Sequence, residues 1–255
     1  MGFAMNEGKR TRILGVPVDM VTGPEAMEIF IGLMDAKGCS LIVTPNSEIV
    51  LSASSDAGLR SLIESADLII PDGAGLVYAS KILNNPLEER VTGIDFLSDI
   101  LAYLQESGKS AYLLGSKPGV AGLAAGNMNI KYPGLKIAGT HHGYFDASDE
   151  AAIVEDVNSS GAEFLCAALG SPKQEKFIYG HREEFLNIKA AMGVGGSLDV
   201  WSGALKRAPE FYRRHGLEWL YRVLQEPARY KRALKLPVFM MKVICSRNKT
   251  GELHE

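Results

Sequence analysis

The sequence has few cysteines, and they follow no recognisable pattern. Cys39, Cys166 and Cys245 lie far apart in the 255 residues, so neither a disulfide framework nor a zinc site is indicated. No apolar run approaches the ~18 residues that cross a bilayer, and no charged-then-apolar leader opens the chain. These absences argue against a membrane-spanning or exported protein, and we expect a reducing cytoplasm.

The motifs of several common enzyme classes are also missing. The sequence contains no G-x-G-x-x-G fingerprint with an acidic residue at the ribose-binding spacing, and no Walker A loop. No Ser/His/Asp order or nucleophile elbow is visible, which disfavours a covalent hydrolase. His141 and His142 are adjacent, and neighbouring residues of an extended chain point to opposite faces, so they do not indicate a metal pair.

What the sequence does have is an uneven distribution of charge. The net charge is −3, from 27 basic and 30 acidic residues. Residues 203–255 hold 12 of the basic and 5 of the acidic residues, a net +7, which leaves −10 on residues 1–202. A basic tail predicts an anionic partner: a membrane surface, a phosphorylated ligand or nucleic acid. The acidic body disfavours nucleic acid, and a solvated helix end is the simpler alternative.

Short apolar runs alternate with longer amphipathic ones along residues 1–202. Strand-like runs lie at 13–18, 41–44, 68–71, 111–115, 136–140, 164–170 and 190–194. Helical patterns lie at 24–36, 47–66 with a break near Ser55, 75–83, 95–106, 120–131, 149–159 and 174–186. This alternation predicts an α/β core with a Rossmann-like, mostly parallel sheet and helices on both faces. Residues 203–255 are predicted to form a helical C-terminal appendage.

Polar residues gather at the predicted carboxyl ends of the strands, where such sheets bind ligands. Thr44 and Asn46 flank Pro45, which stops a central strand, although Asn46 could equally serve as a helix cap. Asp72 follows another strand and precedes two glycines. A carboxylate there can act as a general base, hold a sugar hydroxyl, hold a metal or merely cap a helix.

Two further strand ends are rich in glycine. Gln174 opens a helix after the turn at 169–173, with both a donor and an acceptor to offer. Gly193, Gly195 and Gly196 are expected to expose backbone amides just before a helix, which is typical of an anion cradle.

The basic tail combines arginines with apolar and aromatic residues. Arg222, Arg229 and Arg232 are spaced at i, i+7 and i+10, roughly one helical face, although Pro227 interrupts a straight helix. The apolar run 236–244 is too short to span a bilayer. Such a segment is typical of a helix lying on a membrane surface, and ordinary packing onto the body is the alternative. Arginine also binds diphosphates in bidentate fashion.

Several of these segments together resemble the WecG/TagA/CpsF family of glycosyltransferases. They are Thr-Pro-Asn at 44–46, Pro-Asp-Gly-Ala-Gly at 71–75, and the segments 92–95, 170–175, 193–196, 207–209, 218–222 and 226–227. The resemblance covers about residues 12–235, with the motifs in the expected order.

The resemblance implies an inverting transfer of N-acetylmannosamine from its UDP donor to the 4-hydroxyl of undecaprenyl-diphosphate-linked N-acetylglucosamine. The product would be the linkage disaccharide of wall teichoic acid. No metal or other cofactor is expected, and the enzyme would lie peripherally on the anionic inner face of the cell membrane. A different UDP-sugar donor stays open, as does a homo-oligomer. A nicotinamide-dependent oxidoreductase is the competing class.

The resemblance also assigns roles to individual residues. Asp72 is the expected general base, or a group that orients the acceptor hydroxyl. Thr44, Asn46 and Gln174 are expected to line the substrate pocket, and Arg90 is a further candidate. The strand-end glycines Gly193, Gly195 and Gly196 are the other expected substrate-binding residues. By resemblance, Arg222, Arg229 and Arg232 are expected to hold the diphosphate. From the basic character of the tail, Arg207, Arg213 and Arg214 are also expected to meet diphosphate or membrane. The chemistry agrees, because an inverting transfer needs a base on the acceptor oxygen and a cation for the leaving group.

Overall fold

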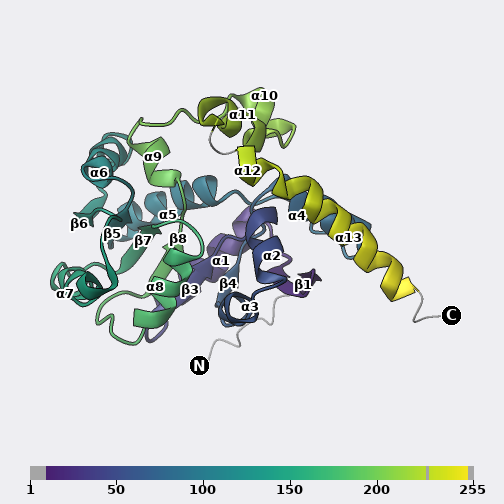
Figure 1. Cartoon of the computed structure of the whole chain (residues 1–255). Coiled ribbons are helices and arrows are strands. Elements are labelled where there is room, and N and C mark those ends of the chain that lie inside the picture. The colour runs from purple at the N-terminus through teal and green to yellow at the C-terminus, as the bar shows by residue number, and fades with distance from the viewer. Residues whose placement is uncertain (1–9, 228–229, 252–255) are drawn as a thin grey trace.

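A parallel sheet of six strands forms the centre of the computed structural model, which describes residues 10–227 and 230–251 (Figure 1). The sheet order is β4-β3-β8-β7-β5-β6, and every neighbouring pair is parallel. The strands are β3 (Ser40–Val43), β4 (Leu68–Ile69), β5 (Ser110–Gly115), β6 (Lys136–His141), β7 (Phe164–Ala168) and β8 (Ala190–Gly193). The predicted Rossmann-like sheet is confirmed.

Helices cover both faces of the sheet, as the alternation predicts. One face carries α1 (Gly23–Met34), α5 (Gly93–Ser107), α6 (Val120–Lys131) and α9 (Ser197–Trp201). The other carries α2 (Ser47–Ala53), α3 (Ala57–Glu64), α4 (Ala74–Ile82), α7 (Glu150–Ser159), which follows the short 3-10 turn η1 (Ala147–Asp149), and α8 (Lys173–His181). Leu41 and Val43 face one core and Ile42 the other, so this buried strand reads as a continuous apolar run.

The predicted strand at 13–18 is wrong, because the chain turns back within it. β1 (Arg10–Ile13) and β2 (Val16–Asp19) form an antiparallel hairpin. Leu14 and Gly15 form its two-residue turn, both in the left-handed region with φ of 52° and 81°. Asp19 accepts a hydrogen bond from the Ile69 backbone N–H at 2.7 Å, which fixes the hairpin beside edge strand β4.

The C-terminal helices are α10 (Glu210–Arg214), α11 (Glu218–Gln225), α12 (Tyr230–Ala233) and α13 (Lys235–Gly251). Helix α13, in yellow in Figure 1, packs on α2 and α4. Phe239 and Val243 are fully buried and belong to the same core as the sheet. The apolar run 236–244 therefore packs partly onto the body, as the alternative interpretation had it.

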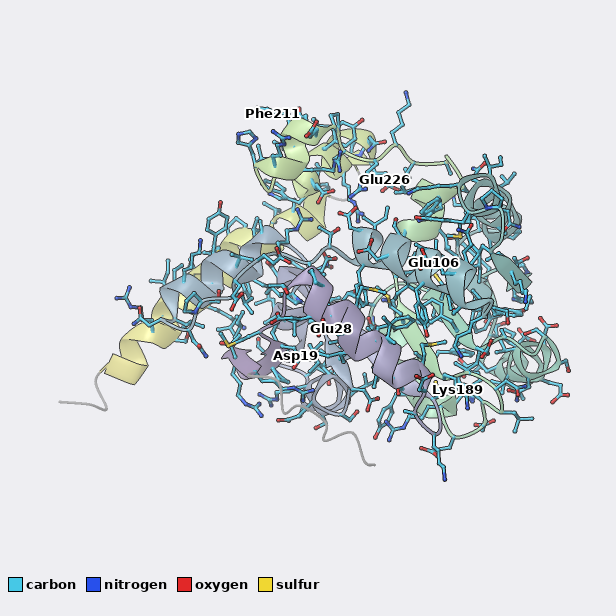
Figure 2. The ribbon with its side chains drawn as sticks, turned by 180° about the vertical axis from the view of Figure 1, so that it is seen from behind. Asp19, Glu28, Glu106, Lys189, Phe211 and Glu226 are labelled. Carbon is cyan, nitrogen blue, oxygen red and sulfur yellow. The ribbon has the colours of Figure 1, made fainter. Side chains whose placement is uncertain are left out.

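The opposite face of the C-terminal helices exposes apolar side chains. Along α13 and just before it, the exposed fraction is 61% for Leu234, 48% for Val238, 66% for Met241 and 50% for Ile244. Figure 2 shows Phe211 on α10, far from the sheet, and its side chain is 62% exposed. Within the described residues, no helix combines the length and the apolar character that a bilayer crossing requires.

We expect Phe239→Ala to lower the free energy of unfolding by about 3–5 kcal/mol, since it leaves a cavity in the core. Met241→Ala, on the exposed face of the same helix, is the matched control and should change it by less than about 0.5 kcal/mol. Urea unfolding of the full chain measures both. Equal effects would show that α13 is not anchored through Phe239.

Candidate active site

Asp72 lies just beyond β4, at the carboxyl edge of the sheet. Its backbone N–H donates to the carbonyl oxygens of Ile70 and Pro45, at 2.9 and 3.2 Å, which ties it to the loop after β3. Gly73, not Asp72, is the N-cap of α4, and no side chain caps that helix. The Asp72 carboxylate is therefore not used as a helix cap.

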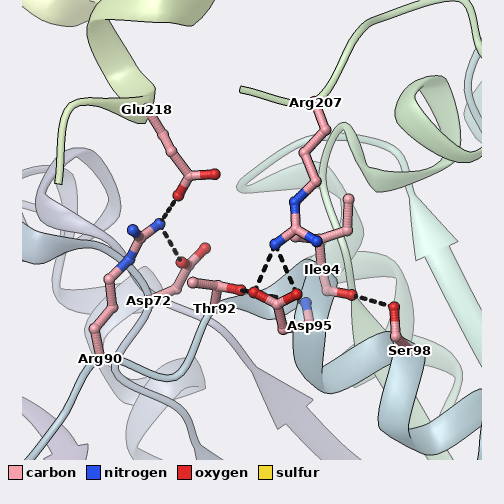
Figure 3. Close-up of polar contacts among 8 residues, drawn as sticks. All are labelled: Asp72, Arg90, Thr92, Ile94, Asp95, Ser98, Arg207 and Glu218. Atoms are coloured by element: carbon pink, nitrogen blue, oxygen red, sulfur yellow. Dashed lines mark hydrogen bonds and ion pairs between the residues drawn. The ribbon is translucent and has the colours of Figure 1, made fainter. Parts of the chain in front are cut away.

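A single guanidinium joins Asp72 to the C-terminal helices (Figure 3). Nη2 of Arg90 lies 3.9 Å from Oδ1 of Asp72, and the same nitrogen donates to Oε2 of Glu218 on α11. All three side chains are largely enclosed, with exposed fractions of 28% for Asp72, 20% for Arg90 and 16% for Glu218. Two carboxylates thus compete for one arginine.

The surroundings of Asp72 favour its protonated form. Burial raises the pKa of Asp72 above its usual range, and the nearby Glu218 carboxylate acts in the same direction. Arg90, Arg222 and the Gly93 backbone N–H oppose the rise but do not cancel it. A carboxylate with a raised pKa is a stronger proton acceptor once ionised, which suits a general base.

A second ion pair fixes the start of the C-terminal segment. Nη2 of Arg207 donates to both carboxylate oxygens of Asp95, each at 2.6 Å. The Thr92 hydroxyl donates to Asp95 and accepts the Asp95 backbone N–H, which caps α5. Burial acts to raise the pKa of Asp95, but Arg207 and Thr92 hold it below its usual range. Asp95 therefore stays ionised and keeps Arg207 in place.

Between these two ion pairs lies a basic cavity of about 350 Å³. Its basic lining residues are Lys81, Arg90, Arg207, Arg213 and Arg214. In the part of the chain that the structure describes, three of these arginines have a buried Nε–H without an acceptor: Arg90, Arg207 and Arg213. The guanidinium groups of the lining and the N-termini of α4 and α5 give the cavity a positive potential.

The turn between α10 and α11 packs closely against the N-terminus of α4. Gly216 has a φ of 69°, and a Cβ on it would lie 2.6 Å from the Cβ of Ala74. A larger residue would be strained there and would push the turn away from α4. This glycine therefore allows Glu218, two residues later, to reach Arg90.

Thr44 and Asn46 lie beside Asp72, as the strand-end rule predicts. A Cβ on Gly93 would be 3.5 Å from the Thr44 hydroxyl oxygen and 3.6 Å from Oδ2 of Asp72, so both groups face the same point. The Thr44 hydroxyl donates to the Gly193 carbonyl at 3.1 Å. Asn46 caps α2 through its side-chain oxygen, so its amide nitrogen is the group left for a substrate.

Gln174 lies in the interior, with an exposed fraction of 2%. Its side-chain oxygen accepts the backbone N–H groups of Gly170 and Gly195, at 3.2 and 3.1 Å. Its amide nitrogen donates to Glu175 at 2.9 Å. The Gln174 amide therefore holds two strand-end loops together and is occupied by protein partners.

Several backbone N–H groups in the loop of Gly193, Gly195 and Gly196 already donate hydrogen bonds within the protein. The Gly195 N–H is taken by Gln174, and the N–H groups of Val194 and Ser197 donate to backbone carbonyls at 2.9 and 3.1 Å. The Gly195 amide is thus taken by a protein partner, while the role of Gly193 and Gly196 stays a prediction. The positive cavity is instead built from arginine side chains.

The three regularly spaced tail arginines do not share one helix. Helix α11 ends at Gln225, before Pro227, and Arg232 belongs to the separate helix α12. Arg222 is exposed yet close enough to Asp72 to lower its pKa. Arg229 and the side chain of Arg232 lie outside the described residues.

Sequence reasoning gave no role to Glu218 or Asp95, although both stand in the quoted motifs. A group of arginines in an enclosed site needs counter-charges, and that rule could have singled them out. His141 makes a local contact, between its Nδ1 and the His142 carbonyl. Among the described residues, no three His, Cys, Asp or Glu side chains are grouped so that they could hold a metal ion.

The family model described as "Glycosyl transferase WecG/TagA/CpsF family" matches residues 11–252. The chain belongs to the WecG/TagA/CpsF family. It is therefore a glycosyltransferase, which confirms the resemblance seen in its motifs and makes the oxidoreductase alternative wrong.

Curated relatives are similar over most of the chain. A Staphylococcus aureus (strain MRSA252) protein is 35% identical over 240 residues, which cover 93% of each chain. A Bacillus subtilis (strain 168) protein is 35% identical over 83% of this chain and 81% of its own. A Bacillus spizizenii protein is 34% identical over 87% of this chain and 85% of its own. Each is named N-acetylglucosaminyldiphosphoundecaprenol N-acetyl-beta-D-mannosaminyltransferase.

We expect Arg207→Ala to loosen the C-terminal segment, because it removes the two hydrogen bonds from Nη2 of Arg207 to the Asp95 carboxylate. Chymotrypsin, which does not cut at arginine, should cleave the variant within residues 211–221 roughly fivefold faster than wild type. This factor corresponds to a loss of ~1 kcal/mol in the free energy of local opening. Lys206→Ala, with the same charge change and an exposed side chain, should cleave at the wild-type rate. Equal rates for all three proteins would mean that Arg207 does not hold the segment.

Proposed function

We propose that this enzyme transfers N-acetylmannosamine from UDP-N-acetylmannosamine to the 4-hydroxyl of undecaprenyl-diphosphate-linked N-acetylglucosamine, with inversion. The names of the curated relatives support the transferred sugar and the acceptor. The observation that carries the proposal is the enclosed Asp72 carboxylate beside a cavity lined by arginines. The product would be the linkage disaccharide of wall teichoic acid.

The proposed reaction is a single displacement. Asp72 takes the proton of the acceptor 4-hydroxyl as its oxygen bonds to the anomeric carbon of the donor sugar. The bond from that carbon to the UDP oxygen breaks on the opposite side, which inverts the anomeric centre. Arginines of the cavity stabilise the negative charge that develops on the departing diphosphate. Both substrates carry a diphosphate, which suits a site with so many guanidinium groups.

We also propose that the enzyme acts peripherally on the cytoplasmic face of an anionic membrane. The C-terminal helices present exposed apolar side chains among basic ones: Phe211, Trp219, Leu220, Leu224, Tyr230, Leu234, Val238, Met241 and Ile244. Apolar groups of this kind enter the boundary between headgroups and acyl chains, and each nearby Lys or Arg adds about 1 kcal/mol at an anionic surface. The lipid carrier of the acceptor would lie in the same membrane.

Asp72→Asn should lower the turnover number by about 10²–10⁴-fold, since Asn cannot accept the proton, while donor binding stays near that of wild type. The wild-type kcat/KM should rise with pH through the raised pKa of Asp72, because the carboxylate is the active form. The assay uses UDP-N-acetylmannosamine, UDP-N-acetylglucosamine as the alternative donor, and a short-chain diphospholipid acceptor.

Asp99→Asn, one turn beyond Asp95 on α5, is the control and should keep wild-type turnover. Undiminished turnover in Asp72→Asn would remove Asp72 from the mechanism. Transfer from UDP-N-acetylglucosamine alone would overturn the proposed donor.

Leu224→Glu should weaken sedimentation with anionic liposomes, because it places a charge in the proposed membrane-facing surface. Leu123→Glu on α6 is a matched control, since both leucines are 63% exposed. Point substitutions are preferable to deleting the tail, because the deletion would remove the buried Phe239 and Val243 from the core. If Leu224→Glu sediments as wild type does, the proposed surface is wrong.

A further inference from the structure

Glu218 reaches into the site from the C-terminal helices, although its helix contributes little to the core. Helix α11 has no buried residue, yet the Glu218 side chain is only 16% exposed. Its carboxylate lies against Nη2 of Arg90, the nitrogen that is 3.9 Å from Asp72. Removing the Glu218 carboxylate from water costs free energy. Helix α11 recovers little of it through packing, because none of its residues is buried. Such a placement calls for an explanation other than packing.

Without Glu218, Asp72 would be the carboxylate nearest to that nitrogen of Arg90. A close ion pair between them would stabilise the ionised carboxylate and occupy an oxygen lone pair. Asp72 would then be a poor acceptor for a proton from a sugar hydroxyl. The contact with Glu218 leaves Asp72 at a distance beyond a hydrogen bond from Arg90.

We propose that Glu218 is a positioning residue: it holds the Arg90 guanidinium off Asp72, so that the Asp72 carboxylate stays available for the acceptor hydroxyl. The inference rests on the proposed function, in which Asp72 is the base. It adds that the C-terminal segment brings a charged group that makes the base effective. Docking of α11 and activation of Asp72 are then one event.

Other contacts of the segment support this coupling. The Arg207–Asp95 pair fixes the chain before α10, and Gly216 seats the following turn on α4. Both contacts place the first turn of α11, where Glu218 lies, over Arg90. A displaced segment would withdraw Glu218 and return Arg90 to Asp72.

The charges facing this trio come from several elements. Asp72 is influenced by Arg90, by Arg222 and Glu218 on α11, and by the Gly93 N–H at the start of α5. Arg90 and Glu218 also share their cavity with Lys81, Asp95, Arg207, Arg213, Arg214 and His215. Glu218 raises the pKa of Asp72, whereas the two arginines lower it. Removing the charge of Glu218 therefore shifts the balance toward the arginines.

The test compares kcat/KM against pH for wild type and Glu218→Gln, which keeps the shape and removes the charge. We expect the rising limb to move about one pH unit lower, and the plateau to fall roughly threefold to tenfold. Glu218→Asp retains the charge, so its rising limb should lie close to the wild-type pH. Glu163→Gln is the matched control: Glu163 pairs with Lys109 just before β7, away from the cavity, and its profile should match wild type.

A second readout does not depend on turnover. Carbon-13 NMR titration of the Asp72 carboxyl, assigned by its loss in Asp72→Asn, should show a lower pKa in Glu218→Gln than in wild type. A rising limb and a carboxyl titration that both stay at their wild-type pH would overturn the proposal, even if activity falls. Failure of the proposed function is distinct, because it appears as an inactive wild type or an active Asp72→Asn.

Discussion

The guanidinium of Arg90 connects two parts of the chain that lie far apart in the sequence. It lies between Asp72, at the edge of the sheet, and Glu218, on α11. Two carboxylates and one arginine in a largely enclosed space cannot all be satisfied equally, since each charge must be compensated in a poorly solvated site. Burial, the division of Arg90 between its two partners, and Arg222 together set the proton affinity of Asp72. The proposed chemistry depends on that division.

The fold supplies each part of this arrangement separately. Parallel strands deliver Asp72 and Thr44 to the same edge, while α4 and α5 begin around the cavity. The C-terminal segment adds further arginines and Glu218, and α13 anchors the segment through the buried Phe239. One face of α13 belongs to the core and the other is apolar and exposed. One face of the helix is thus fixed to the enzyme, and the other is the face for which membrane contact is proposed.

Local rules were enough to predict the sheet, the helix break near Ser55 and the position of Asp72 at a strand end. They failed where the outcome depended on distant partners or on a turn within an apolar run. Leu14 and Gly15 turn the chain inside the predicted strand, because both adopt a left-handed conformation. The pairing of Arg90 with Glu218 spans 128 positions, and no spacing rule links such residues.

The account is tested most directly by a crystal structure of the enzyme with UDP and a short-chain, diphosphate-linked N-acetylglucosamine. We expect the acceptor 4-hydroxyl to lie within hydrogen-bond distance of Asp72, diphosphate oxygens to contact the cavity arginines, and Glu218 to remain on Arg90. A complex in which the 4-hydroxyl faces away from Asp72 while α11 stands off the site would contradict it.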